Sequence, residues 1–220
     1  MKLNQYIDHT ILKATATASD VIQLCAEAKA HEFFSVCINS AWVALAKAHV
    51  AGSSVKVCSV IGFPLGAMSA AAKVFEAKTA VADGADEIDM VINVGLLQSG
   101  QSDAVREEIR AIKHAIGSRV LKVIIETCYL NAEEKARACT LAVDAGADFV
   151  KTSTGFGTGG ASFEDVQLML DTVAGKAKVK ASGGVRSAET ARKYVEMGVM
   201  RLGTSNGIQI VSGETVSGGY

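Results

Sequence analysis

A chain of 220 residues is long enough for one sizeable hydrophobic core and short for two ordinary domains. Hydrophobic residues make up 49% and charged residues 20%, which excludes a disordered chain and fits a globular enzyme. A net charge of −1 without Lys/Arg runs argues against a nucleic-acid partner, and no apolar run is long enough to span a membrane. Five scattered cysteines without a CxxC pair, and an N-terminus without the apolar segment of a signal peptide, predict reduced thiols and a cytoplasmic location.

Short apolar, β-branched runs alternate with Ala/Glu/Lys-rich stretches along the whole chain. The predicted strands, in chain order, are residues 6–12, 33–39, 54–63, 87–93, 121–127, 148–154, 178–184 and 201–205. Helical spacing is clearest over Ala70–Ala82, Asp103–Ile116, Ala132–Asp144 and Ala188–Met197. Eight strand–helix units predict an α/β fold of the (β/α)₈ TIM-barrel type, with residues 1–220 as a single domain. We expect residues 212–220, SGETVSGGY, to form a flexible C-terminal tail.

A weak internal repeat aligns three of these units. Gly84, Gly146 and Gly198 each follow a predicted helix and precede a predicted strand, which suits the left-handed position after a helix. The fifth residue after each glycine should therefore lie at a similar height on its strand. Those residues are Asp89, Lys151 and Gly203. Equivalent positions on three strands thus hold an acidic side chain, a basic side chain and no side chain.

Lys151 is the strongest single candidate for a catalytic residue. It follows Asp-Phe-Val inside an apolar strand, where burying an unpaired ammonium is costly. Desolvation favours the neutral amine of a lysine, and the neutral amine is the form that attacks a carbonyl. The alternative is a lysine at a strand end that reaches solvent or pairs with an acid.

Charged residues on the neighbouring strands favour the catalytic interpretation. Lys180 lies one unit later, and a second cation nearby disfavours the charge on the first. Asp89 lies about two units earlier, where its carboxylate could shuttle a proton or simply pair with a buried lysine. Lys122 and Glu126, on the strand between, are expected to help set the charge balance of the pocket.

Two glycine-rich turns near the C-terminus predict a phosphate site. Gly183 and Gly184 follow one strand, and Gly203 through Gly207 follow the next. Barrels often bind phosphate at these last two loops through backbone N–H groups, and the Ser205 hydroxyl can add a further donor. Ordinary turn chemistry is the alternative.

Other patterns predict no metal or organic cofactor. The four histidines are dispersed, with no pair at ligand spacing. Residues 155–160 match GxGxxG, but no acid ends a following strand at the distance a dinucleotide site needs, so we expect an active-site loop instead. Cys37 is placed at the mouth of the barrel and interpreted as packing, because no His or acid stands beside it in a recognisable pattern.

Taken together, the motifs resemble the deoxyribose-phosphate aldolase family of class I aldolases. The resemblance covers nearly the whole chain and runs through YIDHTIL, VCIN, IGFPLG, EIDMVIN, LKVIIET, ADFVKTSTGF, KASGGVR and LGTS. It implies a (β/α)₈ barrel that reversibly cleaves 2-deoxy-D-ribose 5-phosphate to acetaldehyde and D-glyceraldehyde 3-phosphate.

The resemblance also implies residue roles. Lys151 in KTSTGF would form the Schiff base, Lys180 in KASGGVR would favour its neutral amine, and Asp89 in EIDMVIN would act as acid/base through water. The phosphate-holding turns match Gly183, Gly184, Gly203, Ser205 and Asn206.

Two positions bear on how far the resemblance extends. Phe156 stands where some members of the family carry a phosphate-contacting lysine, which either weakens the expected contact with phosphate or shifts it to Arg186. The final residue, Tyr220, matches a C-terminal tyrosine thought to assist proton exchange, and a frayed terminus is the alternative.

The expected partners are a small aldehyde and a sugar phosphate, with a homodimer as one compatible assembly. Two other functions remain open on the sequence. One is a transaldolase-like Schiff-base barrel acting on a different sugar phosphate. The other is a phosphate-binding barrel without catalysis, which the set of Lys151, Lys180 and Asp89 disfavours.

Overall fold

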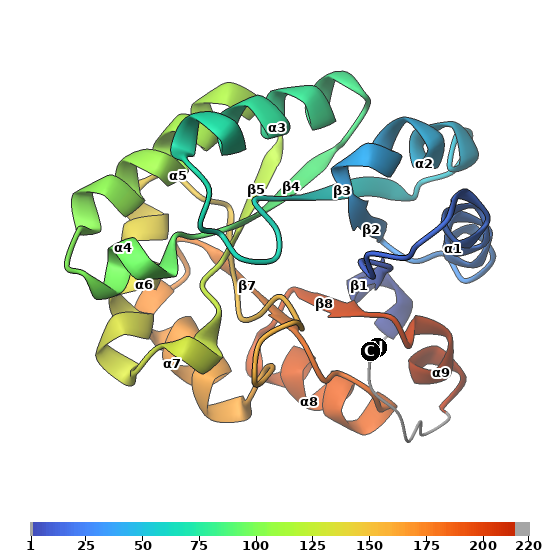
Figure 1. Cartoon of the computed structure of the whole chain (residues 1–220). Helices are drawn as coiled ribbons and strands as arrows, with labels where there is room; N and C mark the ends of the chain where they lie inside the picture. The colour runs from blue at the N-terminus through green and yellow to red at the C-terminus, as the bar shows by residue number, and fades with distance from the viewer. Residues whose placement is uncertain (1, 214–220) are drawn as a thin grey trace.

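The computed structural model describes residues 2–213, which form one closed eight-stranded barrel surrounded by helices (Figure 1). The strands are β1 Ile7–Thr10, β2 Ser35–Asn39, β3 Lys56–Ile61, β4 Glu87–Val91, β5 Val120–Ile124, β6 Phe149–Lys151, β7 Lys178–Ser182 and β8 Arg201–Thr204. Every neighbouring pair is parallel, and β8 pairs with β1 to close the barrel. The predicted (β/α)₈ fold is confirmed.

Helices follow the strands and pack on the outside of the barrel. The α-helices are α1 Ala18–Ala30, α2 Val43–His49, α3 Ala70–Ala82, α4 Val94–Gln98, α5 Ser102–Ile116, α6 Ala132–Asp144, α7 Phe163–Val173, α8 Ala188–Met197 and α9 Gly207–Ser212. Three short 3₁₀ helices, η1 Leu3–Tyr6, η2 Ser40–Trp42 and η3 Thr127–Tyr129, lie between them. Three of the four helices predicted by range match residue for residue, and α5 begins one residue earlier than expected.

Local sequence explains where these helices begin and end. The Asn131 side chain accepts from the backbone of Glu134, whose own side chain accepts in return from Asn131, and this capping box starts α6. At the start of α3, α7 and α8, the side chains of Ser69, Ser162 and Ser187 each accept a hydrogen bond from the backbone N–H three residues later, without a reciprocal bond. The three glycines of the repeat have φ between 85° and 110°, a region that side chains disfavour, so each ends its helix before the next strand.

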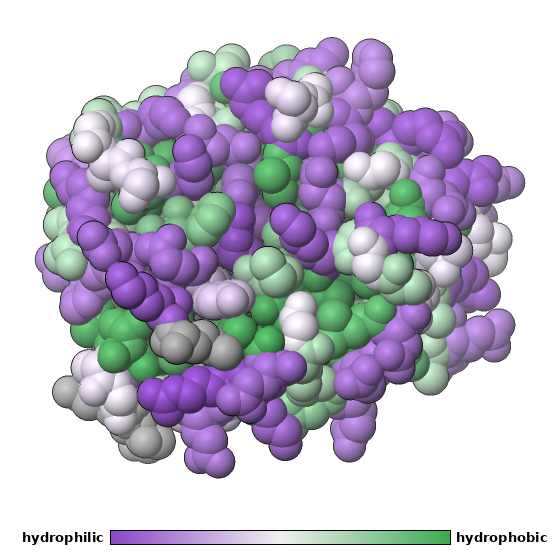
Figure 2. Space-filling view, turned by 180° about the vertical axis from the view of Figure 1, so that it is seen from behind, coloured by the Kyte–Doolittle hydropathy of each residue, from purple (hydrophilic) through white to green (hydrophobic). Residues whose placement is uncertain are grey.

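Apolar side chains on the outer face of the strands pack against the helices. Val36, Ile88, Val123, Val179 and Leu202 are fully buried members of this layer. A small second cluster of Leu12, Cys37, Cys58 and Val60 lies apart from it, with Phe63 packed against it. Seen from behind, the surface is largely polar, with apolar side chains gathered in a hollow across its middle (Figure 2).

The register between strands is staggered around the barrel. Asp89 pairs with Lys122, but Lys122 pairs with Phe149, so Lys151 lies two residues further along. Tilted strands produce this offset, because hydrogen-bonded partners lie at different heights along the barrel axis. Lys151 itself pairs with Lys180. No helix of the described residues has the length and apolar character to cross a membrane.

The predicted C-terminal tail is only partly within the described residues. Ser212 is the last residue of α9 and Gly213 is its cap. Residues 214–220, which include Tyr220, lie outside the described residues.

Candidate active site

Lys151 is the last residue of β6, and its side chain lies inside the barrel. The residue is only 3% exposed, and its Nζ donates to Oδ2 of Asp89 over 2.9 Å. Among the described residues, the Lys151 amine therefore forms an ion pair with a single buried carboxylate, that of Asp89. The arrangement combines the two interpretations of Lys151, since the lysine is both buried and paired.

Asp89 connects the three lysines named from the sequence. Its Oδ2 also accepts from Lys180 over 2.8 Å, and its Oδ1 accepts from Lys122 over 2.7 Å. Burial alone would raise the pKa of the Asp89 carboxyl, but the three surrounding ammonium groups outweigh burial and hold it well below its usual range. Asp89 is therefore a carboxylate at neutral pH.

Three further charged residues complete a buried network. Asp8 on β1 accepts from Lys180 over 2.5 Å and from Arg201 over 2.7 Å. Glu87 on β4 accepts two hydrogen bonds from Arg201 and contacts Lys122 at 2.6 Å. We call the set the barrel ion cluster. Its members are Asp8, Glu87, Asp89, Lys122, Lys151, Lys180 and Arg201.

The carboxylates keep most of these cations charged. Burial lowers the pKa of Lys180, but Asp8 and Asp89 more than compensate, so its pKa is raised. The same balance of burial against neighbouring carboxylates raises the pKa of Lys122 and of Arg201. Asp8 is the converse case, because its lysine and arginine neighbours overcome burial and lower its pKa. The cluster therefore holds Asp8 and Asp89 ionised, with Lys122, Lys180 and Arg201 as firmly protonated partners.

The glycine-rich turns after β7 and β8 lie beside each other, as the sequence predicts. Gly184, Arg186, Gly203, Ser205 and Asn206 share the lining of one small hollow with Val185 and Thr204. Gly203 has a packing reason to be glycine, because a Cβ there would lie 3.1 Å from Cε of Lys180. The phosphate role of these residues stays a prediction.

Gly183 has a different environment from the other predicted phosphate residues. Its backbone packs against Gly160 of the β6–α7 loop, where a Cβ on Gly160 would lie 2.3 Å from the Gly183 carbonyl oxygen. The N–H of Ala161 donates to the carbonyls of Ser182 and Gly183. The β6–α7 loop, residues 152–162, is thus fixed to the turn that follows β7.

Phe156 lies in that loop at the mouth of the barrel. Its ring meets the edge of Phe63, from the β3–α3 turn, with the centroids 5.3 Å apart. A cavity of about 670 Å³ lies alongside, lined by Phe156, Ser205 and residues of β1 and α1. Among the described residues, no member of the barrel ion cluster lines this cavity, and Ser205 lines both it and the hollow at the turns after β7 and β8.

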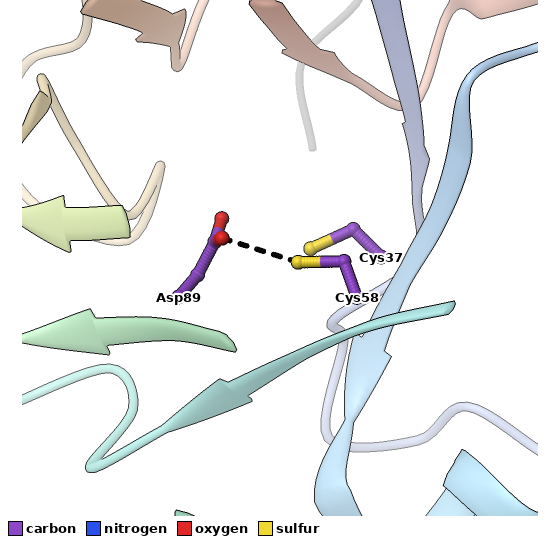
Figure 3. Close-up of side chains that lie close together, drawn as sticks. All are labelled: Cys37, Cys58 and Asp89. Carbon is purple, nitrogen blue, oxygen red and sulfur yellow. Dashed lines mark hydrogen bonds between the residues drawn. The ribbon is translucent and has the colours of Figure 1, made fainter. Parts of the chain in front are cut away.

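Cys37 lies deeper than predicted. It is fully buried in the barrel interior, not at the mouth, because β2 directs it toward its direct partner Cys58 on β3. Figure 3 shows both thiols facing Asp89, to which Cys58 donates over 3.1 Å. The neighbouring Cys58 thiol is the main influence that lowers the pKa of the Cys37 thiol, to about 7.

A metal ion needs several ligating side chains close together. The two thiols and the Asp89 carboxylate are the one group of three or more His, Cys, Asp or Glu side chains, among the described residues, whose potential metal-ligating atoms all lie within 4.8 Å of one another. The donor set does not suit a divalent cation. Asp89 already accepts from three ammonium groups and one thiol, so a metal would add positive charge to a site rich in it.

Glu126 lies outside the barrel ion cluster and is bonded to Thr154 of the β6–α7 loop. Burial raises the pKa of its carboxyl, and the charge of Lys151 is among the influences that oppose this. Lys122 belongs to the barrel ion cluster. Asp8, Glu87 and Arg201 also belong to the site and were not predicted from the sequence. A signal for one of them was present, because Glu87 lies two residues before Asp89 in a buried strand, and such residues point to the same face.

These features define a barrel with a buried amine, a paired carboxylate and glycine-rich turns, which is the arrangement of a lysine-dependent aldolase. The DeoC/LacD family aldolase model matches residues 2–213, and the chain belongs to this family.

Similarity to individual proteins extends over the full chain. The chain is 58% identical to a deoxyribose-phosphate aldolase of Finegoldia magna over 97% of its own length and 100% of that protein. It is 54% identical to one from Streptococcus uberis over the whole of both chains. The solved tetrameric deoxyribose phosphate aldolase of Aeropyrum pernix is 33% identical, with a TM-score of 0.88 over 96% of this chain and 89% of that one.

Proposed function

We propose that this chain reversibly cleaves 2-deoxy-D-ribose 5-phosphate to acetaldehyde and D-glyceraldehyde 3-phosphate. The end-to-end identity of 54–58% to deoxyribose-phosphate aldolases supports that substrate. The observation that carries the chemistry is the buried Lys151 amine beside a single carboxylate, Asp89, in a barrel interior that otherwise holds firmly charged groups.

Charge balance identifies Lys151 as the nucleophile. The barrel ion cluster has four cationic and three anionic side chains, so it becomes neutral when one lysine loses its proton. Lys180 contacts two carboxylates at close range, and Lys122 likewise contacts two. Among the described residues, Lys151 contacts only one, and it shares that oxygen with Lys180. Lys151 is therefore the amine with the fewest carboxylate contacts in the cluster, which supports it as the group that attacks the carbonyl.

The reaction then follows from these positions. The Lys151 amine adds to C1 of the open-chain sugar, giving a carbinolamine that loses water to form a protonated imine. Asp89, through water, takes the proton of the C3 hydroxyl while the C2–C3 bond breaks. The bond electrons enter the imine, which becomes an enamine, and D-glyceraldehyde 3-phosphate leaves. Protonation of the enamine carbon and hydrolysis release acetaldehyde and restore Lys151. No metal or organic cofactor takes part.

The phosphate group of the substrate is assigned to the turns after β7 and β8. Gly184, Ser205 and Asn206 surround one hollow, with Arg186 on its rim as a cation. Glycines allow the backbone N–H groups to approach an anion closely. Arg186 takes the part that the lysine at the position of Phe156 plays in other members of the family.

The surroundings of the enzyme follow from the same residues. All five cysteines are free thiols, which supports a reducing, cytoplasmic location. We also propose a homo-oligomer, with a dimer as its smallest form, in line with the tetrameric relative from Aeropyrum pernix.

Trapping the imine tests the nucleophile. Borohydride reduction of the protein in acetaldehyde should leave one two-carbon adduct, and peptide mass mapping should place it on Lys151. The exposed Lys176 serves as an internal control that stays unmodified, and Lys151→Leu should give no adduct. An adduct on another lysine would refute the assignment. Activity that disappears with EDTA would favour a metal-dependent route, and transaldolase-like use of other sugar phosphates would correct the substrate.

A further inference from the structure

Glu126 has an unusual backbone conformation at the end of β5. Its φ of 54° and ψ of 70° lie in the left-handed region, which non-glycine residues adopt at a cost of about 1–3 kcal/mol. Among the described residues, two others share a positive φ without being glycine, Glu32 and Ala174, and both are exposed residues after helices. Glu126 is 3% exposed and follows a barrel strand at its carboxyl end. Its strain therefore lies on the catalytic side of the barrel.

The strained backbone directs the Glu126 carboxylate at Thr154. The Thr154 N–H donates to both carboxylate oxygens, over 3.2 and 3.3 Å, and its hydroxyl donates to Oε2. Thr154 is itself buried, at 3% exposure. One carboxylate thus satisfies both polar hydrogens of a residue three positions after Lys151, out of contact with solvent.

Thr154 passes this constraint on to the rest of the β6–α7 loop. Its hydroxyl oxygen accepts from the N–H of Phe156 over 3.0 Å. One residue further, Gly157 packs so closely that a Cβ there would lie 2.7 Å from Sγ of Cys128, on the same segment as Glu126. The beginning of the loop is therefore fixed against the end of β5.

The β6–α7 loop is attached at one end beside the Lys151 amine and at the other end to the predicted phosphate-binding turn at Gly183. On one side, Ile125 and Thr127 donate backbone hydrogen bonds to the carbonyls of Lys151 and Thr152. On the other side, Ala161 donates to the turn at Gly183. The loop spans the distance from the amine to the phosphate turns, and the Glu126–Thr154 contact fixes its first half.

We propose that Glu126 and Thr154 form a positioning pair that holds the β6–α7 loop so that Lys151 and the phosphate turn keep the separation the phosphorylated substrate requires. This inference rests on the proposed function. The pair acts through the loop and not on the reacting atoms. Its loss should therefore reduce the advantage of a phosphorylated over a non-phosphorylated sugar and leave the amine competent.

Four variants test the pair. Thr154→Val removes the hydroxyl and keeps the shape, and Thr154→Ser restores the hydroxyl. Glu126→Gln keeps the size but replaces one acceptor by a donor, and the double variant Glu126→Gln/Thr154→Val measures coupling. Thr140→Val, on α6, is the matched control, because its hydroxyl bonds only to a carbonyl of its own exposed helix turn. Each variant is assayed for kcat and KM with deoxyribose 5-phosphate and with deoxyribose.

A positioning role gives a specific pattern. Thr154→Val and Glu126→Gln should each lower kcat/KM for deoxyribose 5-phosphate by about 10- to 100-fold, the scale of a 1 Å misplacement. The loss with deoxyribose should be at least about fivefold smaller, and the double variant should be no worse than the poorer single variant. Thr154→Ser should recover most of the activity, and Thr140→Val should match the wild type.

Other outcomes overturn the proposal. Equal losses on both substrates, or a Thr154→Val enzyme within twofold of the wild type, would show that the pair positions nothing. A Glu126→Gln loss that Thr154→Val does not reproduce would instead make Glu126 an acid or base. The borohydride adduct on Lys151, measured in every variant, separates this test from that of the function. A wild type without the adduct refutes the function, whereas variants that keep the adduct and lose phosphate preference support the pair. If Thr154→Val does not fold, Glu126→Gln and Thr154→Ser decide.

Discussion

Replacing Gly160 by alanine places a methyl group in the tightest backbone contact between the β6–α7 loop and the turn after β7. The added Cβ would lie 2.3 Å from the carbonyl oxygen of Gly183 and 2.5 Å from its carbonyl carbon. Real Cβ atoms essentially never approach closer than 3.0 Å, so the two segments must separate by about 0.7 Å or more. The added Cβ would contact backbone atoms of Gly183, which cannot rotate away from it as a side chain could.

The expected cost divides between stability and catalysis. Overpacking of a well-packed contact typically costs about 1–3 kcal/mol, and we expect a loss of stability within that range. Gly160 is not among the glycines with positive φ, so alanine adds no backbone strain. A displacement approaching 1 Å should lower kcat/KM for deoxyribose 5-phosphate by up to about 100-fold. The loss should exceed that for deoxyribose, because the displaced turn is assigned to the phosphate.

Steady-state kinetics and urea unfolding together measure both effects. Gly95→Ala is the matched control, because a Cβ there meets only the Asn93 side-chain oxygen at 3.5 Å, an ordinary contact within α4. That control should be as active as the wild type. A Gly160→Ala enzyme with kcat/KM within twofold of the wild type and an unchanged urea midpoint would refute the reasoning that this contact positions the turn.

Two further predictions concern the buried charges. Asp8→Asn leaves Lys180 and Arg201 short of a carboxylate, which should cost about 3–5 kcal/mol of stability at neutral pH. The folded state lowers the pKa of Asp8 below its ordinary 3.8, so its stabilisation is complete above that pH and is lost only as the pH falls on toward and through the lowered folded-state pKa. The unfolding free energies of wild type and Asp8→Asn should therefore stay apart at neutral pH and converge only as the pH falls well below 3.8, and curves that stay parallel there would contradict this. Outside the barrel, Lys73 is fully buried against Glu108 at 2.8 Å, so Lys73→Met should also cost about 3–5 kcal/mol. Adding Glu108→Leu should restore most of that loss in urea unfolding, and an additive double variant would show that the two residues are uncoupled.

The sequence predicts the barrel well because its signals are local. Buried parallel strands are near-continuous apolar runs, and the glycines after α3, α6 and α8 mark where each following strand begins. That spacing is also why Asp89, Lys151 and Lys180 could be placed together, and the structure does bring them into contact. The offset of two residues between Asp89 and Lys151 could not be predicted, because it depends on strand tilt.

What the sequence does not predict are contacts between distant strands. Arg201 bonds to Asp8 from the other end of the chain, and no local pattern links them. The position of Glu126, on the strand between those of Asp89 and Lys151, predicts a part in the charge balance of the pocket. The left-handed backbone at Glu126 turns its carboxylate toward Thr154 instead, and such a conformation is invisible in residue type.

Barrel closure between β1 and β8 has a consequence for synthesis of the chain. Asp8 precedes Lys180 and Arg201 by 172 and 193 residues, so it leaves the ribosome long before them. A nascent or truncated chain without β8 would bury Asp8 and Glu87 without their guanidinium partner, which is too costly for the interior to close. Incomplete chains are therefore expected to lack an assembled amine site, so a half-made enzyme does not form adducts with cellular aldehydes. Completion of the polypeptide and assembly of its reactive centre are coupled in this barrel.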